Sequence, residues 1–220
     1  MDRHDPRGLH TLFRRLPLLV TAAILGGSAL SPAGQTSRVV SIADHRILGD
    51  RNANVTVIEF GDYQCAFCRR FWRETLPRIR REYIDTGKVR LVYWDFPQSV
   101  HPEAVIAARA AECAADRSKY WEYHDKVFRE QDKRGSDVVR FKAGDLKRWA
   151  TEIGLEATPF NECLDSARHE DEVAVNHAHG AEVGVDGTPT FFINGTRLVG
   201  AQPFAVFQKV IEEELGRQKN

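Results

Sequence analysis

The residues with the clearest potential for chemistry are two cysteines, Cys65 and Cys68, with two residues between them. They follow a short apolar run at residues 55–60 and open a segment with helical periodicity, so the pair stands at an expected helix start. Unpaired backbone N–H groups and the positive end of the helix dipole favour a thiolate there, which is a nucleophile near neutral pH. Two sulfur atoms on one turn are also close enough to bond, so the spacing indicates redox chemistry.

The two thiols are expected to have different roles. Cys65 faces the helix N-terminus and is predicted to be an exposed nucleophile. Cys68 joins the apolar face of the helix with Phe71 and Trp72, and is predicted to be a buried resolving thiol. Two other interpretations share this spacing, because a passive disulfide and half of a zinc site have the same pattern.

A third candidate is Glu59, which lies six residues before Cys65. It falls on the same face of the expected strand as Val55 and Val57. Burial there raises the pKa of a carboxyl group, which suits it to exchanging protons with Cys68. The alternative is a glutamate at the strand end that reaches water.

An expected β-α-β unit positions these residues. Residues 55–60 are β-branched and almost wholly apolar, as in a strand covered on both faces, and residues 89–94 form a similar run. Between them, apolar residues from Cys68 to Tyr83 recur at helical spacing, and Pro77 is expected to bend this helix. A helical connection between two strands predicts a parallel pair.

The rest of the chain divides into a helical stretch and a second part that contains strands. Residues 102–183 have several segments of helical periodicity and no strand pattern. Two short apolar runs at residues 190–193 and 197–199 flank an Asn-Gly turn at residues 194–195, which predicts a hairpin. A final helix is expected from Pro203 onward.

Three motifs occur along the chain in a characteristic order: Glu-Phe-x-Asp-x-x-Cys-x-x-Cys at residues 59–68, Asp-Phe-Pro at 95–97 and Gly-Thr-Pro-Thr-Phe-Phe-x-Asn-Gly at 187–195. This order resembles the DsbA-type thiol:disulfide oxidoreductases of the thioredoxin superfamily, over residues from about 50 to 215. The resemblance implies an α/β thioredoxin fold, with β-α-β and β-β-α halves around a central sheet and an inserted all-helical domain. The divisions expected are residues 1–33 as signal peptide, 34–97 as the N-terminal half, 98–184 as the helical insertion and 185–220 as the C-terminal half.

The resemblance also implies roles for residues outside the Cys65–Cys68 pair. A cis peptide bond between Thr188 and Pro189 is expected to face the cysteines and to expose a backbone edge for an extended substrate. A structural disulfide is expected between Cys113 and Cys163, where closing a loop of about fifty residues contributes roughly 4 kcal/mol by chain entropy. The alternatives are an ordinary trans proline and two separate buried thiols.

The first 33 residues indicate export. Arg14 and Arg15 precede an apolar stretch at residues 16–30, and small residues at 31–33 offer a cleavage site. The stretch contains Pro17 and falls short of the roughly 20 apolar residues that span a bilayer, which favours a cleaved signal peptide over an N-terminal membrane anchor. The expected location is periplasmic or otherwise extracytoplasmic.

The remaining chain is close to neutral and sized for one domain. Residues 1–33 hold four of the 31 basic and two of the 31 acidic residues, so 27 basic and 29 acidic residues follow. Because the sequence contains no strongly basic run, nucleic acid is not an expected partner. About 185 residues suit a single domain, expected to be a monomer, and four cysteines fit two disulfides.

The predicted function is disulfide exchange with other exported proteins through Cys65 and Cys68, with disulfide formation as the favoured direction. Unfolded or misoxidised exported proteins are the expected clients, a membrane redox partner is expected to recycle the protein, and no bound cofactor is needed. Ala66 and Phe67 replace the Pro-His pair of the most oxidising members of the family, so no cation lies between the cysteines and a milder oxidant is expected. The alternatives are a periplasmic reductase or isomerase, and a non-catalytic zinc-binding or chaperone module.

Overall fold

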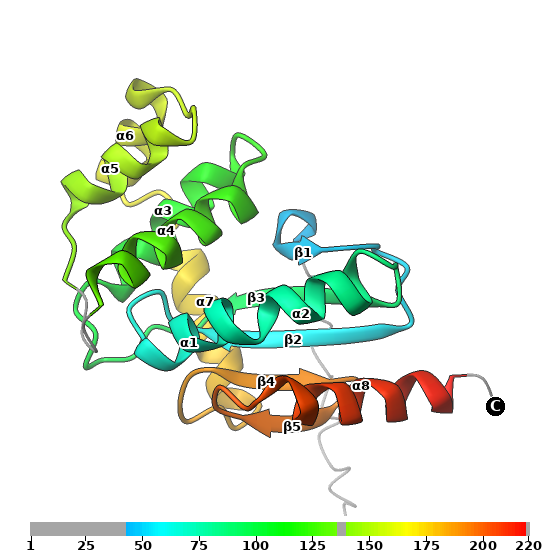
Figure 1. The fold of residues 1–220 in the computed structure, drawn as a ribbon. Helices are drawn as coiled ribbons and strands as arrows, with labels where there is room; N and C mark the ends of the chain where they lie inside the picture. Colours follow the sequence, from blue (N-terminus) through cyan, green and yellow to red (C-terminus); the bar gives the residue numbers. More distant parts are fainter. Residues whose placement is uncertain (1–42, 136–139, 219–220) are drawn as a thin grey trace, which may run out of the picture. The chain divides into compact units, whose positions relative to one another are not determined.

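The computed structural model describes residues 43–135 and 140–218 (Figure 1). The predicted signal peptide, residues 1–33, lies outside the described residues. In the described part of the chain a five-stranded sheet has the order β1-β3-β2-β4-β5. β2 and β3 are parallel, and the other neighbouring pairs are antiparallel. The strands are β1 (Ile47–Leu48), β2 (Val55–Gly61), β3 (Val89–Asp95), β4 (Thr190–Ile193) and β5 (Thr196–Val199).

Helices pack against both faces of this sheet, which confirms the predicted α/β class with a helical insertion (Figure 1). One face carries α1 (Ala66–Glu74), α2 (Leu76–Ile79), the π-helix η2 (Arg80–Ile84) and α8 (Phe204–Arg217). The other face carries α7 (Glu170–Glu182). The insertion also contains α3 (Ala104–Ala115), α4 (Tyr120–Arg134), α5 (Ala143–Glu152) and α6 (Ala157–Asp165).

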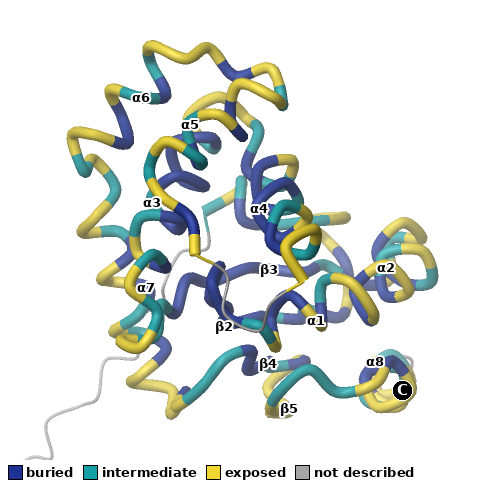
Figure 2. Tube along the Cα trace, turned by 60° about the vertical axis from the view of Figure 1, so that its left-hand side comes forward, coloured by how far each residue is buried: buried dark blue, intermediate teal, exposed yellow. Residues whose placement is uncertain are grey.

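The central strand β2 is buried on both sides because its residues alternate between two apolar clusters (Figure 2). Val57 packs with Phe71 and Phe207 in the cluster under α1 and α8. Phe60 belongs to the opposite cluster, under α7. The predicted parallel pairing with β3 is present, with Glu59 opposite Tyr93 in the register. β2 therefore ends inside the protein, and the turn that follows it, residues 62–65, is buried as well.

The first long helix is interrupted rather than merely bent. α1 ends at Glu74, and α2 begins at Leu76 with Pro77 in its first turn. Proline has no backbone N–H to continue the ladder of hydrogen bonds, which explains a new helix start at this point. The Thr75 side chain donates to the carbonyl oxygen of Gln202 at 3.1 Å and ties the break to the loop before α8.

An arginine near the start of the described chain connects the sheet to the insertion. Arg46 is only 2% exposed and lies in the 3₁₀-helix η1 (Asp44–Arg46). Its guanidinium donates to Asp95 at 2.8 Å and forms an ion pair with Glu112 at 2.5 Å, so the buried charge is paired. Sequence analysis missed η1 and the two-residue strand β1 because elements this short show no periodicity.

In the described part of the chain, no helix has both the length and the apolar character needed to cross a membrane.

Gly180 allows α7 to approach the sheet closely. A Cβ atom at this position would lie 2.5 Å from the Phe96 ring and 3.0 Å from the Phe60 ring, both of which are buried. We therefore expect Gly180→Ala to lower the free energy of unfolding by about 1–3 kcal/mol through overpacking. Urea unfolding of the purified protein measures this change.

The matched control is Gly216→Ala, because Gly216 is also helical and a Cβ there has no neighbour within 4 Å. Its better helix propensity predicts an unchanged or slightly higher stability, by up to about 1 kcal/mol. Equal effects of the two substitutions would contradict the close approach of α7.

Candidate active site

Cys65 and Cys68 lie at the start of α1, shortly after the end of β2. Cys65 is the N-cap residue of α1, and Cys68 stands in the first turn. Both cysteines are free thiols in this structure. The backbone N–H of Cys65 donates to the carbonyl oxygen of Asp62 at 3.1 Å, which shapes the turn before the helix. The helix N-terminus and both sulfur atoms therefore share one small region.

Cys65 is more buried than the sequence predicted, since only 5% of the residue is exposed. The cover comes from the loop before β4, where the Thr188–Pro189 peptide bond is cis. The Cys65 thiol donates to the carbonyl oxygen of Thr188 at 3.3 Å. A contact between residues 123 positions apart could not be read from local sequence, and this explains the error.

The pairing of β4 with β2 brings that loop to the cysteines. β4 runs antiparallel to β2 with Thr190 opposite Phe60, so the start of β4 meets the end of β2. The loop is fixed by a hydrogen bond from the Thr190 hydroxyl to Gly187 and by one from the Gly200 N–H to Pro189. Thr188 and Pro189 are thus held beside Cys65.

The two thiols differ in acidity. A hydrogen bond from the Cys68 side chain lowers the pKa of Cys65 to about 6, against the opposing effect of burial. Burial raises the pKa of Cys68 well above its usual value, and its Sγ accepts the Asp62 N–H at 3.5 Å. Cys65 is therefore the thiol that ionises near neutral pH, and Cys68 is the one that holds its proton.

Glu59 is buried on the face of β2 that α1 covers, with 2% of the residue exposed. Burial raises the pKa of its carboxyl group well above the usual value, and a negative charge on Cys65 raises it further. One carboxyl oxygen, Oε2, has no hydrogen-bond partner among the described residues. Such a group holds its proton to a higher pH than an exposed glutamate does, and it can release or accept a proton when the charge around it changes.

Sequence analysis gave no role to Asp62 and His101, which also lie at the site. The Asp62 carboxylate is buried and 2.7 Å from Nδ1 of His101. The available signal for Asp62 was its place three residues before Cys65, where a short acidic side chain can cap backbone N–H groups. His101 lies 39 residues from Asp62 in the chain, and nothing in the sequence connected them.

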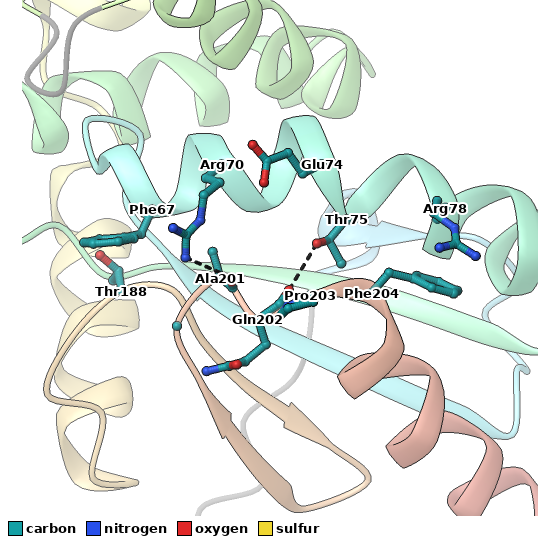
Figure 3. Close-up of a pocket in the computed structure, with 11 residues that line it drawn as sticks. Phe67, Arg70, Glu74, Thr75, Arg78, Thr188, Ala201, Gln202, Pro203 and Phe204 are labelled. Atoms are coloured by element: carbon teal, nitrogen blue, oxygen red, sulfur yellow. Dashed lines mark hydrogen bonds between the residues drawn. The ribbon is translucent and has the colours of Figure 1, made fainter.

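An open groove of about 660 Å³ runs from the site along α1 (Figure 3). Phe67, 55% exposed, and Thr188 lie at one end, and Phe204 lies toward the other. Arg70 reaches across it and donates to the carbonyl oxygen of Ala201 at 3.0 Å. At the end near Cys65, where Phe67 and Thr188 lie, the groove gives an extended chain room beside the thiol.

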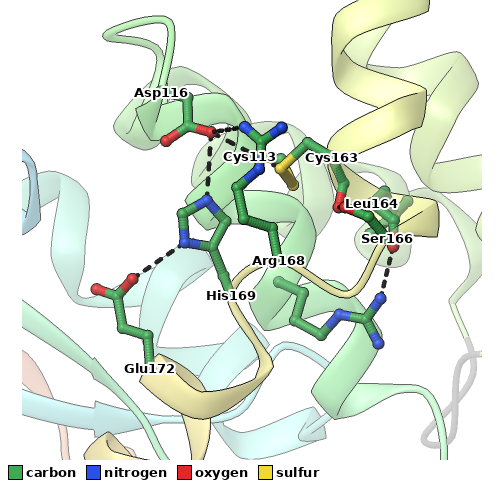
Figure 4. The surroundings of a disulfide bond; sticks show 9 residues. Cys113, Asp116, Cys163, Leu164, Ser166, Arg168, His169 and Glu172 are labelled. Carbon is green, nitrogen blue, oxygen red and sulfur yellow. Dashed lines mark hydrogen bonds and ion pairs between the residues drawn. A yellow bond between two sulfur atoms is a disulfide. The ribbon is translucent and has the colours of Figure 1, made fainter.

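Cys113 and Cys163 form a disulfide between α3 and α6 (Figure 4). Both residues are buried, and Arg168 and His169 lie beside the bond and contact Asp116. The two sulfur atoms are bonded to each other, so they are not thiolates that could complete a zinc site with Cys65 and Cys68.

A family model described as thioredoxin matches residues 41–213 of this chain. The chain is 36% identical over 155 residues to the Na⁺/H⁺ antiporter NhaA 3 of Salinispora tropica, covering 70% of this chain and 22% of the antiporter. The match thus spans about a fifth of that relative. A probable disulfide bond formation protein D of Bacillus cereus is 30% identical over 228 residues, covering 98% of this chain and 99% of the relative.

Among solved structures, the oxidised form of BdbD from Bacillus subtilis is similar, with a TM-score of 0.71 and 26% identity. The superposition covers 78% of this chain and 92% of BdbD. It extends over the sheet and the helical insertion together, as the sequence resemblance predicted. The chain therefore belongs to the thioredoxin family, as one of its DsbA-like members.

Proposed function

We propose that this protein is a thiol:disulfide oxidoreductase that forms disulfides in other exported proteins. The observation that carries the proposal is the asymmetry of the two thiols at the start of α1. Cys65 has a pKa of about 6 and lies against the Thr188–Pro189 loop, whereas Cys68 is fully buried with a raised pKa. The full-length similarity to a probable disulfide bond formation protein supports the same activity.

In the oxidising direction, a client thiolate attacks Sγ of Cys65 in the Cys65–Cys68 disulfide. The bond between the two enzyme sulfurs breaks, Cys68 leaves with the electron pair, and a mixed disulfide joins Cys65 to the client. A second client thiolate then attacks the client sulfur of that mixed disulfide and displaces Cys65. The client leaves oxidised by two electrons, and the enzyme pair is reduced.

The acidities of the two cysteines suit these steps. Cys65 is the leaving group of the second step, and a thiol of low pKa leaves faster. Cys68 is released in a buried place that disfavours a thiolate, so it must gain a proton. Glu59 is a buried acid beneath α1 and is proposed as the source of that proton.

Disulfide formation is favoured over reduction because stabilising the Cys65 thiolate stabilises the reduced enzyme. When the reduced enzyme is stabilised, its disulfide accepts electrons more readily. The proposed setting is extracytoplasmic and the proposed state is a monomer. A membrane redox partner is proposed to reoxidise the cysteines. A reductase or isomerase of the same compartment is the second candidate, since the Ala66-Phe67 dipeptide supplies no cation.

The Cys113–Cys163 disulfide is proposed to be structural. It lies within the insertion, joins α3 to α6 and closes a separation of 50 residues. Chain entropy alone gives such a closure roughly 4 kcal/mol. Both cysteines are almost fully buried, which keeps the bond from client thiols.

Trapping tests the proposed function directly. In Cys68→Ala the resolving thiol is absent, so mixed disulfides between Cys65 and client proteins are expected to accumulate in the exporting cell. Diagonal electrophoresis and mass spectrometry identify the clients. Cys65→Ala is the matched control and is expected to trap none. Absence of mixed disulfides in Cys68→Ala, with the protein folded and exported, would contradict the proposed activity.

The acidity of Cys65 predicts a pH profile for alkylation of the reduced protein. The rate with iodoacetamide follows the thiolate fraction, so it is expected to be near its plateau at pH 7 and to fall as the pH drops through about 6. An ordinary cysteine would reach half of its plateau near pH 8.5. A half-maximal rate near that value would refute the assigned acidity.

Glu59→Gln is predicted to slow proton-dependent exchange at Cys68 by about 10- to 100-fold, because the amide cannot transfer a proton. Stopped-flow kinetics of a client peptide across pH measures the rate, and circular dichroism checks the fold. Glu213→Gln is the control, since Glu213 lies exposed on α8 and does not line the groove beside Cys65. An identical pH–rate profile for Glu59→Gln and the wild type would remove Glu59 from the mechanism.

A further inference from the structure

Asp62 joins both redox cysteines to a histidine from another part of the chain. Its backbone N–H donates to Cys68 Sγ at 3.5 Å, and its carbonyl oxygen accepts the Cys65 N–H at 3.1 Å. Its carboxylate accepts the Gln64 and Gln98 N–H groups at 2.7 and 2.8 Å, and lies 2.7 Å from Nδ1 of His101. Asp62 is 1% exposed, so its carboxylate lies beside the thiols almost entirely shielded from solvent and is held there by these hydrogen bonds.

A lone carboxylate here would oppose the chemistry. The negative charge of Asp62 raises the pKa of Cys65, because two like charges in a buried site repel each other. His101 is positioned to cancel that charge. Its side chain is 18% exposed and approaches the carboxylate from the segment that follows β3. The bond to Asp62 raises the pKa of His101, and the charge of Cys65 raises it as well.

The segment that carries His101 is itself tied to the turn before α1. The His101 N–H donates to Gln98, and its carbonyl oxygen accepts from the first residue of α3, Ala104. Glu103 is the other acidic group near the imidazole, and it bonds to Gln64 and to Arg140. His101 is therefore held in place by backbone bonds on both sides, and its charge faces Asp62, Cys65 and Glu103.

We propose that His101, held as an imidazolium by Asp62, is a positioning residue whose charge stabilises the Cys65 thiolate and so stabilises the reduced enzyme. Ala66 and Phe67, between the cysteines, carry no charge, and His101 supplies a cation from the segment after β3 instead. The inference rests on the proposed oxidoreductase function and names a further residue for it. With His101 charged, the thiolate, Asp62 and His101 carry a net charge of −1, and with His101 neutral they carry −2.

The electrostatic coupling between His101 and Cys65 must act equally in both directions. If the imidazolium stabilises the Cys65 thiolate, the thiolate stabilises the imidazolium by the same free energy. Oxidation to the Cys65–Cys68 disulfide removes the thiolate. His101 is therefore expected to titrate at a higher pH in the reduced protein than in the oxidised one. The internal reference is His179, which packs against Trp94 under α7 and not on the face of the sheet that α1 covers, so the redox state of the cysteines is expected to leave its ring signals unchanged.

The first experiment follows the histidine ring protons of the wild-type protein by NMR from pH 5 to 9, in the reduced and the oxidised state. The expected result is a fall in the His101 proton affinity on oxidation by about three- to tenfold, with no change at His179. Identical His101 titrations in the two states would overturn the proposal. This measurement needs no variant and does not depend on folding of a mutant.

The second experiment measures the Cys65 thiolate in His101→Gln, in which an amide N–H can still donate to Asp62 but carries no charge. The acidity of Cys65 is expected to fall by about three- to tenfold. Adding Asp62→Asn removes the uncompensated carboxylate and is expected to restore it. His179→Gln is the matched control and should leave Cys65 unchanged. A purely structural His101 would leave the single variant unshifted or the double variant unrescued, and either result would refute the inference.

The two proposals fail separately. Mixed disulfides trapped by Cys68→Ala together with an unshifted His101 would remove the histidine and keep the oxidoreductase function. A His101–Cys65 coupling without any trapped client would remove the function and keep the electrostatic pairing.

Discussion

A thiolate in a largely buried site must be stabilised by donors and cations that the fold brings to it, and the rest of this active site depends on that requirement. Cys65 stands at the N-terminus of α1, accepts a hydrogen bond from Cys68 and touches the Thr188 loop. The first two contacts are local, whereas the Thr188 contact joins residues 123 positions apart in the chain. The pKa of Cys65 thus depends on the pairing of β2 with β4 as well as on the local helix start.

Strand β2 makes this convergence possible. Its apolar residues bury it between β3 and β4, so the turn that follows it lies beside the segments that adjoin both of these neighbours. The parallel neighbour leads to the segment with His101, and the antiparallel neighbour is preceded by the cis Thr188–Pro189 bond. Glu59, near the end of β2, places a buried carboxyl group with a raised pKa on the face that α1 covers. The groups gathered at this end of the sheet therefore give the two thiols different pKa values, lowered for Cys65 and raised for Cys68.

The sequence predicted the elements better than the contacts between them. The apolar run before Cys65 and the Asn194-Gly195 turn are local signals, and both lead to strands that the structure contains. The burial of Cys65 and the pairing of Asp62 with His101 depend on tertiary contacts, for which one sequence offers no periodicity. Arg46 shows the same limit, because a basic residue in a short polar segment gives no sign that it will be buried between carboxylates.

The central claim is that stabilising the Cys65 thiolate makes the Cys65–Cys68 disulfide an oxidant. The most direct measurement is its reduction potential, from equilibration of the purified protein with glutathione at pH 7. The account predicts a value well above the roughly −270 mV of thioredoxin and below the roughly −120 mV of the strongest oxidant of this family. A potential at or below about −270 mV would contradict it, because such a pair donates electrons to client disulfides.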